Sequence, residues 1–147
     1  INFIPRRRLK NKKFTIICDN CWAGKVYKEL GLPYQTPFVG MFVFSPDYIK
    51  MLKNLKYYLS GNIPLKFVKE SKYIKDFDNA YPLALLDDIE LHFLHYANEE
   101  EATQKWNRRL KSFHTRVRLF SLQRIIVTYL HWSTLNQLKS KDMLESI

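Results

Sequence analysis

The stretch FTIICDNCWAGKVYKELG, residues 14–31, predicts the fold class of this 147-residue chain. Its first part, FTIIC (14–18), is a short apolar and β-branched run of the kind that forms a buried strand. The following AGKVYKEL (23–30) has apolar residues near helical spacing, and Gly31 is a common helix stop. A buried strand that leads directly into a helix favours an α/β fold.

The next two segments repeat this alternation. FVGMFVF (38–44) predicts a second buried strand. SPDYIKMLKNLKYYLSG (45–61) predicts a helix with Ser45 as its N-cap and Pro46 in its first turn. Its apolar residues recur at intervals of three and four, so they are expected to face the core: Tyr48, Ile49, Leu52, Leu55, Tyr58 and Leu59.

Further along, LKFVK (65–69) predicts a third strand. YPLALLDDIELHFLHY (81–96) predicts two strands separated at Asp87 and Asp88. NEEEATQKWNRRLKSF, which begins at residue 98, predicts a helix capped by an asparagine, with acidic residues in the first turn where the helix dipole favours them. The alternating order predicts a layered α/β sheet with helices on its faces.

The end of the chain fits two structures. VRLFSLQRIIVTYLHWSTLNQL (117–138) carries a helical stripe, yet RIIVTYLHW within it is also rich in strand-forming residues. We expect a helix there, with its stripe formed by Leu119, Leu122, Ile126, Tyr129 and Leu130. The whole chain is expected to be one α/β domain over residues 14–147, preceded by a basic arm at 1–13.

The net charge of +10 is concentrated at the two ends. Residues 1–13 carry a net charge of +6, residues 14–104 carry −3 and residues 105–147 carry +7. Such a distribution attracts anions such as nucleic acid, lipid headgroups or phosphorylated sugars, although solvated tails would give the same composition. The absence of a helix-turn-helix, zinc-finger or RNA-recognition pattern argues against nucleic acid.

The apolar runs are too short for a membrane span, which takes roughly 20 residues. The basic N-terminal residues are followed only by the strand-length FTIIC and not by a signal-peptide core. We therefore expect a cytoplasmic protein, with peripheral membrane contact left open. Its two cysteines would stay reduced in that compartment.

Cys18 and Cys21 form a C-x-x-C at a strand-to-helix junction, the position of a thioredoxin-like redox pair. However, Cys18 is also the last apolar residue of the expected strand, so the two sulfurs need not face each other. A zinc site with His92 and His95 is disfavoured because a strand would point these two side chains to opposite faces. We expect no metal site, and no cofactor can be named.

Alternation along the strand after residue 87 places Asp88, Glu90 and His92 on one face. Carboxylates and imidazole that converge can act together as general acid and base or ligate a divalent cation, and these three residues are the catalytic candidates. The alternative is an ordinary solvated strand face, with His95 on the other side as a hydrogen-bonded core histidine.

Several separated motifs carry a resemblance to a known family. They are N-C-W after the first strand, L-P-Y-x-T-P-F-V-G, S-P-D-Y-I, E-x-H-F-L-H-Y and K-W-N-R-R, in this order over about residues 14–110. The chain resembles a bacterial family of unknown function whose members are usually described as exopolysaccharide biosynthesis proteins. The resemblance implies an α/β fold and a role in making or decorating surface glycan, without a reaction that can be carried over.

The chain departs from that family in two places. Relatives often have a small polar residue where Cys18 stands, which weakens the redox interpretation further. They also commonly continue after the K-W-N-R-R helix into another strand and further α/β segments. The sequence from Phe113 onward looks different, so we expect a member that is shortened or divergent at its C-terminus.

Ligands of open α/β sheets bind beyond the carboxyl ends of strands, where the residues after Cys18 would lie. The expected ligand-binding residues are Asn20, Cys21, Trp22, Tyr34, Arg108 and Arg109. Aromatic rings beside polar groups suit sugars, and arginines suit an anionic donor. The alternative for Trp22 is burial as a core residue.

Two functions remain open. The first is a sugar-modifying or sugar-transferring enzyme, or an accessory factor, that uses a sugar nucleotide or a lipid-linked sugar. The second is a non-enzymatic binding module that docks on anionic membrane or nucleic acid through residues 6–13 and 105–124.

Overall fold

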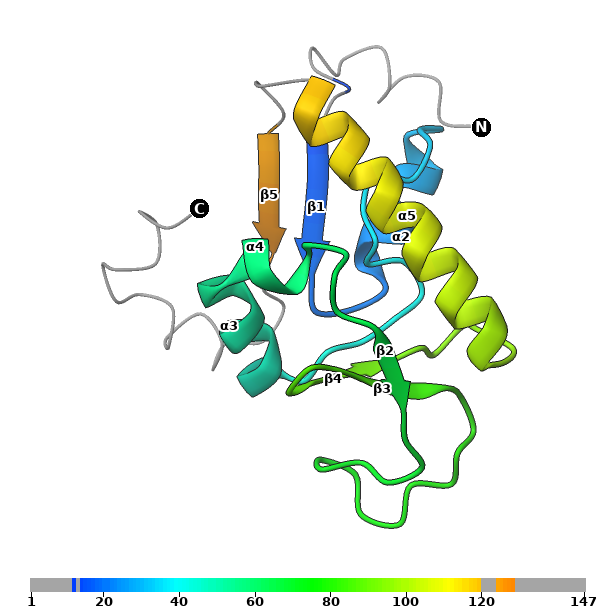
Figure 1. The fold of residues 1–147 in the computed structure, drawn as a ribbon. Helices are drawn as coiled ribbons and strands as arrows, with labels where there is room; N and C mark the ends of the chain where they lie inside the picture. Colours follow the sequence, from blue (N-terminus) through cyan, green and yellow to red (C-terminus); the bar gives the residue numbers. More distant parts are fainter. Residues whose placement is uncertain (1–11, 13, 120–123, 129–147) are drawn as a thin grey trace.

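The structure is a computed structural model that describes Lys12, residues 14–119 and residues 124–128 (Figure 1). Within these residues it is a mixed α/β fold with four helices and two sheets. No helix in the described ranges is both long enough and apolar enough to cross a bilayer.

The first sheet is a parallel pair of strands, β1 (Phe14–Cys18) and β5 (Arg124–Thr128), which lie side by side in Figure 1. The expected strand at 14–18 is thereby confirmed, and all five of its residues are buried. The helix expected within residues 117–138 is wrong for 124–128, where the strand that the sequence also allowed is formed. The β-branched run RIIVT supplies a parallel partner for the buried strand, and this long-range pairing overrides the local helical stripe. Leu122, Tyr129 and Leu130 lie outside the described residues.

The second sheet is antiparallel and has the order β2–β3–β4, with β2 at Leu65–Phe67, β3 at Leu83–Leu86 and β4 at Ile89–His92. It confirms the expected strand at 65–69 and the two strands separated at Asp87 and Asp88. Asp87 has a φ of +57°, a left-handed conformation that aspartate tolerates in a tight turn.

The helices follow their sequence signals with small shifts. The helix α2 spans Trp22–Glu29, and α5 spans Glu99–Leu119, where Asn98 Oδ1 accepts the N–H of Glu101 at 2.9 Å as an N-cap. The single helix expected at 45–61 is two helices, α3 (Ser45–Lys53) and α4 (Leu55–Tyr58), because Asn54 leaves helical geometry. The N-cap position is occupied by Phe44, with Ser45 inside the helix.

The segment 38–44 is buried but is not the strand that its apolar sequence predicts. Gly40 has a φ of +70°, which interrupts an extended conformation. The segment instead makes one isolated bridge, in which Phe42 and His92 exchange backbone hydrogen bonds of 2.8 and 2.9 Å. The N–H of Val43 then bonds to the carbonyl of Asp19 at 2.8 Å, so this segment connects the end of β1 to β4.

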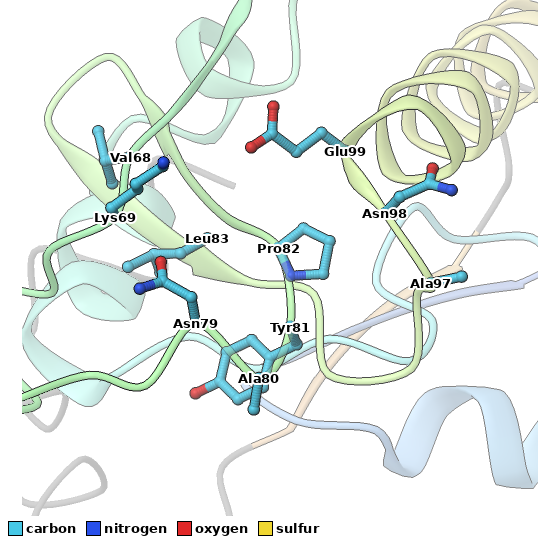
Figure 2. A pocket seen from close by; sticks show the side chains of 10 residues that line it. All are labelled: Val68, Lys69, Asn79, Ala80, Tyr81, Pro82, Leu83, Ala97, Asn98 and Glu99. Carbon is cyan, nitrogen blue, oxygen red and sulfur yellow. The ribbon is translucent and has the colours of Figure 1, made fainter.

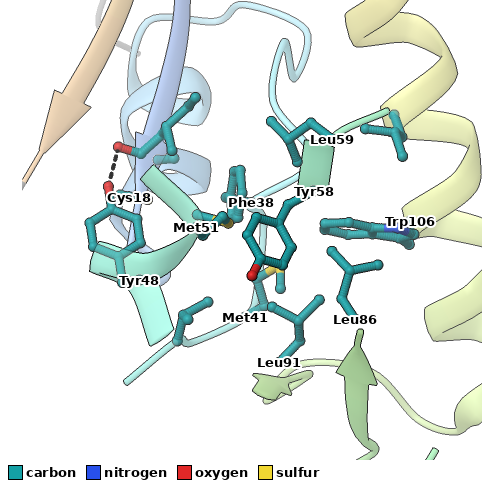
Figure 3. Packing of buried hydrophobic residues seen from close by; sticks show 14 of the residues in the cluster. Cys18, Phe38, Met41, Tyr48, Met51, Tyr58, Leu59, Leu86, Leu91 and Trp106 are labelled. Atoms are coloured by element: carbon teal, nitrogen blue, oxygen red, sulfur yellow. Dashed lines mark hydrogen bonds between the residues drawn. The ribbon is translucent and has the colours of Figure 1, made fainter. Parts of the chain in front are cut away.

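The core lies between the two sheets and α5, with the indole of Trp106 packed edge-on to Phe38 and Phe93 at 6.1 and 6.4 Å between ring centroids. Figure 3 shows Trp106 and Phe38 among the buried side chains of this core. The hydroxyl of Tyr48 donates to the carbonyl of Ile17 at 2.9 Å. Most of the apolar residues predicted to face the core from 45–61 are buried, and Leu55 is half-buried.

Tyr27 of α2 bonds to the backbone of β1 at two points. Its hydroxyl accepts the N–H of Ile16 at 3.1 Å and donates to the carbonyl of Phe14 at 2.9 Å. Both backbone groups belong to fully or nearly fully buried residues, so removing the hydroxyl would leave them without these partners.

Replacing Tyr27 by phenylalanine should therefore lower the free energy of unfolding by about 1–3 kcal/mol, the penalty for an unsatisfied buried polar group. Urea unfolding would measure the change. Tyr34→Phe is the matched control, since Tyr34 is 42% exposed and its replacement should change stability by no more than about 0.5 kcal/mol. Equal effects of the two substitutions would contradict the assigned role of the Tyr27 hydroxyl.

Candidate functional site

Glu90 and His92, two of the three catalytic candidates, are in direct contact. Both lie on β4, and Nε2 of His92 is 2.7 Å from Oε1 of Glu90. The expectation that strand alternation brings them to one face is confirmed. The alternative of a solvated face is wrong for these two residues, because their side chains are only 1% and 0% exposed.

Asp88, the third candidate, has different partners. Its carboxylate lies in the turn before β4, 2.7 Å from Nζ of Lys50 and 2.6 Å from the hydroxyl of Tyr58. The hydrogen bonds from Lys50 and Tyr58 hold its pKa below the ordinary value. The side chain is about half exposed. The structure therefore separates the Asp88 carboxylate from the contact between Glu90 and His92.

A buried aspartate that the sequence analysis did not single out forms a hydrogen bond with the backbone of Glu90. Asp47, on the first turn of α3, accepts the backbone N–H of Glu90 at 2.6 Å. It also accepts the hydroxyl of Tyr73 at 2.8 Å and pairs with Nζ of Lys72 at 2.7 Å. The only sequence signal at Asp47 is an acid near a helix start, which is ordinarily explained by the helix dipole.

Glu90 holds the loop between β2 and β3 through its own carboxylate. Oε1 accepts the hydroxyl of Ser71 at 2.6 Å, and Oε2 accepts the backbone N–H of Lys72 at 2.9 Å. Together with His92, these donors occupy both carboxylate oxygens. We call the five residues Asp47, Ser71, Lys72, Glu90 and His92 the buried polar network, after its buried members Asp47, Glu90 and His92; Ser71 is half-buried and the Lys72 side chain is 39% exposed.

The imidazole of His92 connects this network to Tyr81. The Tyr81 hydroxyl lies 3.1 Å from Nδ1 of His92. Since Nε2 faces a carboxylate, these partners assign the proton to Nε2 and leave Nδ1 to accept the tyrosine hydroxyl. Burial lowers the pKa of His92 below its ordinary value, against the opposing effect of Glu90. A neutral imidazole in this place accepts a hydrogen bond from the Tyr81 hydroxyl at Nδ1.

The expected ligand-binding residues after β1 are held in a defined turn. The side-chain oxygen of Asn20 accepts the N–H of Trp22 at 2.8 Å, and the thiol of Cys21 lies 3.6 Å from the carbonyl of Met41. The indole of Trp22 is 41% exposed, so the alternative that it is a core residue is wrong.

Tyr34 and Arg109 come together on the same side of the fold. The guanidinium carbon of Arg109 lies 5.5 Å from the centre of the Tyr34 ring. The guanidinium also donates to the hydroxyl of Tyr96 and, at 3.3 Å, to the carbonyl of Val39. Arg108, the residue before Arg109, is exposed and has no hydrogen bond or aromatic contact of this kind within the described residues.

The candidates therefore form two groups on either side of the segment from Val39 to Val43. Cys21 contacts Met41 and Arg109 contacts Val39, while the backbone of the next residue, Phe42, pairs with His92. Within the described part of the chain, no hydrogen bond or ion pair joins side chains of one group directly to those of the other. We call Trp22, Tyr34 and Arg109 the aromatic surface.

Residues 1–142 match the family DUF1919, a domain of unknown function. The chain belongs to this family. It is also 36% identical over 109 residues to a protein of Haemophilus influenzae strain Rd that is described as uncharacterized. The aligned part is 74% of this chain and 48% of that protein, so the chain spans about half the length of the relative. The expected membership of a family of unknown function is thereby confirmed.

Both cysteines of this DUF1919 chain are free thiols. Burial raises the pKa of Cys18 to about 11, and its sulfur donates to the carbonyl of Asn20 at 2.9 Å. Burial also raises the pKa of Cys21. Both shifts oppose the thiolate form that redox chemistry needs.

The two histidines that a zinc site would use lie in different surroundings. His92 is buried and contacts Glu90, whereas His95 is exposed, so the alternative that His95 is a core histidine is wrong. The described residues contain no group of three or more residues that could hold a metal ion.

The alternative function, a basic binding module, would use residues 6–13 and 105–124, and the structure describes these segments only in part. Residues 6–11, 13 and 120–123 lie outside the described residues. Within α5, Lys105 pairs with Glu101 and Arg109 bonds to Tyr96, so two of the cations counted there are engaged within the protein.

Cys18 and Cys21 should not form a disulfide that cycles at the potential of the cytosol. In the reduced protein Cys21 should react with a thiol-specific disulfide reagent well before Cys18, since Cys18 is 0% exposed. The variants Cys18→Ser and Cys21→Ser assign the two reaction phases. A Cys18–Cys21 disulfide with a reduction potential near the cytosolic glutathione poise would contradict this prediction.

The lowered pKa of His92 predicts a pH dependence of stability. The unfolded chain takes up this proton near pH 6.5 while the folded chain resists it, so the contribution is present above that pH and is lost as the pH falls. Urea unfolding between about pH 7.5 and pH 5 should show a smaller loss of stability in His92→Gln than in the unchanged protein. His95→Gln, at an exposed histidine of the same segment, is the control. Identical pH slopes for His92→Gln and the unchanged protein would be the contrary result.

Proposed function

We propose that this chain acts in the biosynthesis of a surface glycan by binding an anionic sugar donor, a nucleotide sugar or a lipid-linked sugar phosphate, at the aromatic surface. The observation that carries the proposal is the 42% exposed ring of Tyr34 lying 5.5 Å from the guanidinium carbon of Arg109, with a second exposed aromatic residue, Trp22 at 41%, at the start of α2. The resemblance to proteins described as exopolysaccharide biosynthesis proteins supports the same process.

The two aromatic side chains supply stacking area. Large aromatic residues are mostly buried, and those left partly in water commonly serve recognition. The edge of the Tyr34 ring is packed on Tyr27 at 6.3 Å between centroids, which limits the motion of the exposed ring. A preorganised ring reduces the entropy lost when a sugar or a nucleobase stacks on it.

Arg109 supplies the cation. Its guanidinium is oriented by the Tyr96 hydroxyl and the Val39 carbonyl, and it is shared between the Tyr34 and Tyr96 rings at 5.5 and 5.8 Å. A guanidinium has five N–H donors, so those not used by the protein can bind phosphate oxygens. The net charge of +10 would also favour the approach of an anionic ligand.

Binding is better supported than transfer. Glu90 and His92 are at most 1% exposed, and protein donors occupy both oxygens of the Glu90 carboxylate. A substrate could not reach these atoms without displacing the loop that carries Ser71 and Lys72. Their direct participation in a transferase reaction, and that of Asp88, stays a prediction.

A panel of nucleotide sugars should raise the melting temperature of the protein, because a ligand that binds only the folded state stabilises it. At about a hundred times the dissociation constant the rise should be about 5–10 °C for a chain of this size. Trp22→Ala and Tyr34→Ala should each weaken binding about tenfold through lost stacking.

Tyr57→Ala is the matched control, since Tyr57 is an equally exposed tyrosine, at 44%, but lies on α4. It should leave the ligand-induced shift unchanged. The proposal fails if no nucleotide sugar shifts the melting temperature while the protein binds anionic vesicles or nucleic acid in a salt-dependent way. That result would favour the basic binding module instead.

A further inference from the structure

A separate pocket lies between the β2–β3 loop and the start of α5. Its volume is about 350 Å³, at the small end of the range for ligand pockets. Figure 2 shows its lining, which comes from Val68, Lys69 and residues 79–82 of the β2–β3 loop, Leu83 at the start of β3, and Ala97, Asn98 and Glu99 at the start of α5. None of the residues of the aromatic surface lines it.

Contacts with neighbouring side chains fix the position of the apolar part of the pocket lining. Tyr81 is one of the lining residues, and its hydroxyl lies 3.1 Å from Nδ1 of the buried His92. The ring also packs on Phe77 at 5.0 Å between centroids, and Pro82 follows beside it. A fixed aromatic face next to a proline is suited to stacking against the C–H face of a ligand.

The polar part of the lining has unused hydrogen-bonding capacity. Figure 2 shows Glu99 and Lys69 reaching toward the same opening from α5 and from the loop. Neither side chain has a hydrogen bond or ion pair with any other described residue. Asn79 adds an amide whose hydrogen bond within the described residues is a long one, 3.4 Å from its nitrogen to the carbonyl of Phe77.

These groups select the charge of the ligand. One carboxylate and one ammonium face the opening, so the charges of the lining cancel. An anion would meet the three consecutive glutamates at 99–101 in the first turn of α5, which already offset the positive end of the helix dipole. A neutral ligand with several hydroxyl groups would satisfy the carboxylate, the ammonium and the amide together.

We infer that this pocket binds one neutral sugar unit of a glycan and is a second saccharide site, distinct from the aromatic surface. The inference rests on the proposed function, since that function brings a glycan to the protein. The buried polar network then has a defined task. Glu90 holds the loop through Ser71 and Lys72, and His92 fixes the Tyr81 ring, so both are positioning residues for the pocket.

The test uses free neutral sugars as probes: glucose, galactose, mannose, N-acetylglucosamine and N-acetylgalactosamine. Saturation-transfer NMR at millimolar sugar concentration should show binding of at least one of them to the unchanged protein. Glu99→Gln removes the charge of a hydrogen-bond acceptor and should weaken that binding about tenfold. Glu100→Gln, the neighbouring exposed glutamate outside the pocket lining, is the matched control and should bind as the unchanged protein does.

Two tyrosine variants test the stacking face. Tyr81→Leu should abolish detectable binding, whereas Tyr81→Phe keeps the ring and should weaken binding by a smaller factor. Because loss of the bond to His92 could lower stability, melting curves accompany both variants, and Glu99→Gln tests the site without touching the buried polar network.

The inference is overturned if none of the five sugars binds, or if binding is unchanged in Glu99→Gln and Tyr81→Leu. It is also overturned if Trp22→Ala removes free-sugar binding while Glu99→Gln does not, which would place the sugar at the aromatic surface and support the proposed function alone. Binding of free sugars that depends on Glu99, with no response to nucleotide sugars, would support the pocket and contradict the anionic donor.

Discussion

The carboxylate of Asp47 connects more of this structure than any local sequence signal suggests. Only 3% of the residue is exposed, and it receives a backbone N–H from β4, a lysine ammonium and a tyrosine hydroxyl from the β2–β3 loop. Buried charges are tolerated when they are paired and hydrogen-bonded, and removing one partner of such a pair typically costs about 3–5 kcal/mol. This requirement fixes α3, β4 and the loop relative to one another.

The position of β4 in turn determines the surroundings of both candidate sites. Asp47 bonds to the backbone of Glu90. Glu90 in turn binds the β2–β3 loop, and His92 binds Tyr81, which lines the pocket. On its other side, His92 shares a backbone bridge with Phe42, whose neighbouring residues contact Cys21 and Arg109. Polar side chains that look catalytic in the sequence thus have a clear architectural role in the fold.

The sequence predicted what depends on nearby residues. The strand at 14–18, the N-cap at Asn98 and the turn at Asp87 follow from local patterns, and alternation correctly paired Glu90 with His92. It failed where a distant partner decides the outcome. The β-branched residues of 124–128 become a strand because β1 offers a parallel edge, which no local window contains.

For the candidate functional site too, the sequence predicted what local patterns determine and missed what long-range contacts determine. Trp22 and Cys21 were expected after the strand because topology places them there, but their exposure depends on how α2 packs. Asp47 was missed because an acid after Ser-Pro has an adequate local explanation. The pocket was missed because its lining joins a loop without periodic pattern to a helix start far along the chain.

The short segment from Val39 to Val43 acts as a spacer of fixed length. The carbonyl of Val39 receives the Tyr96 hydroxyl, Gly40 accepts the N–H of His95, and Val43 donates to Asp19, so both ends and the middle are bonded to different elements. Inserting or deleting one residue here would shift every one of these partners and would turn buried side chains such as Met41 outward. Natural length variation should therefore avoid this segment.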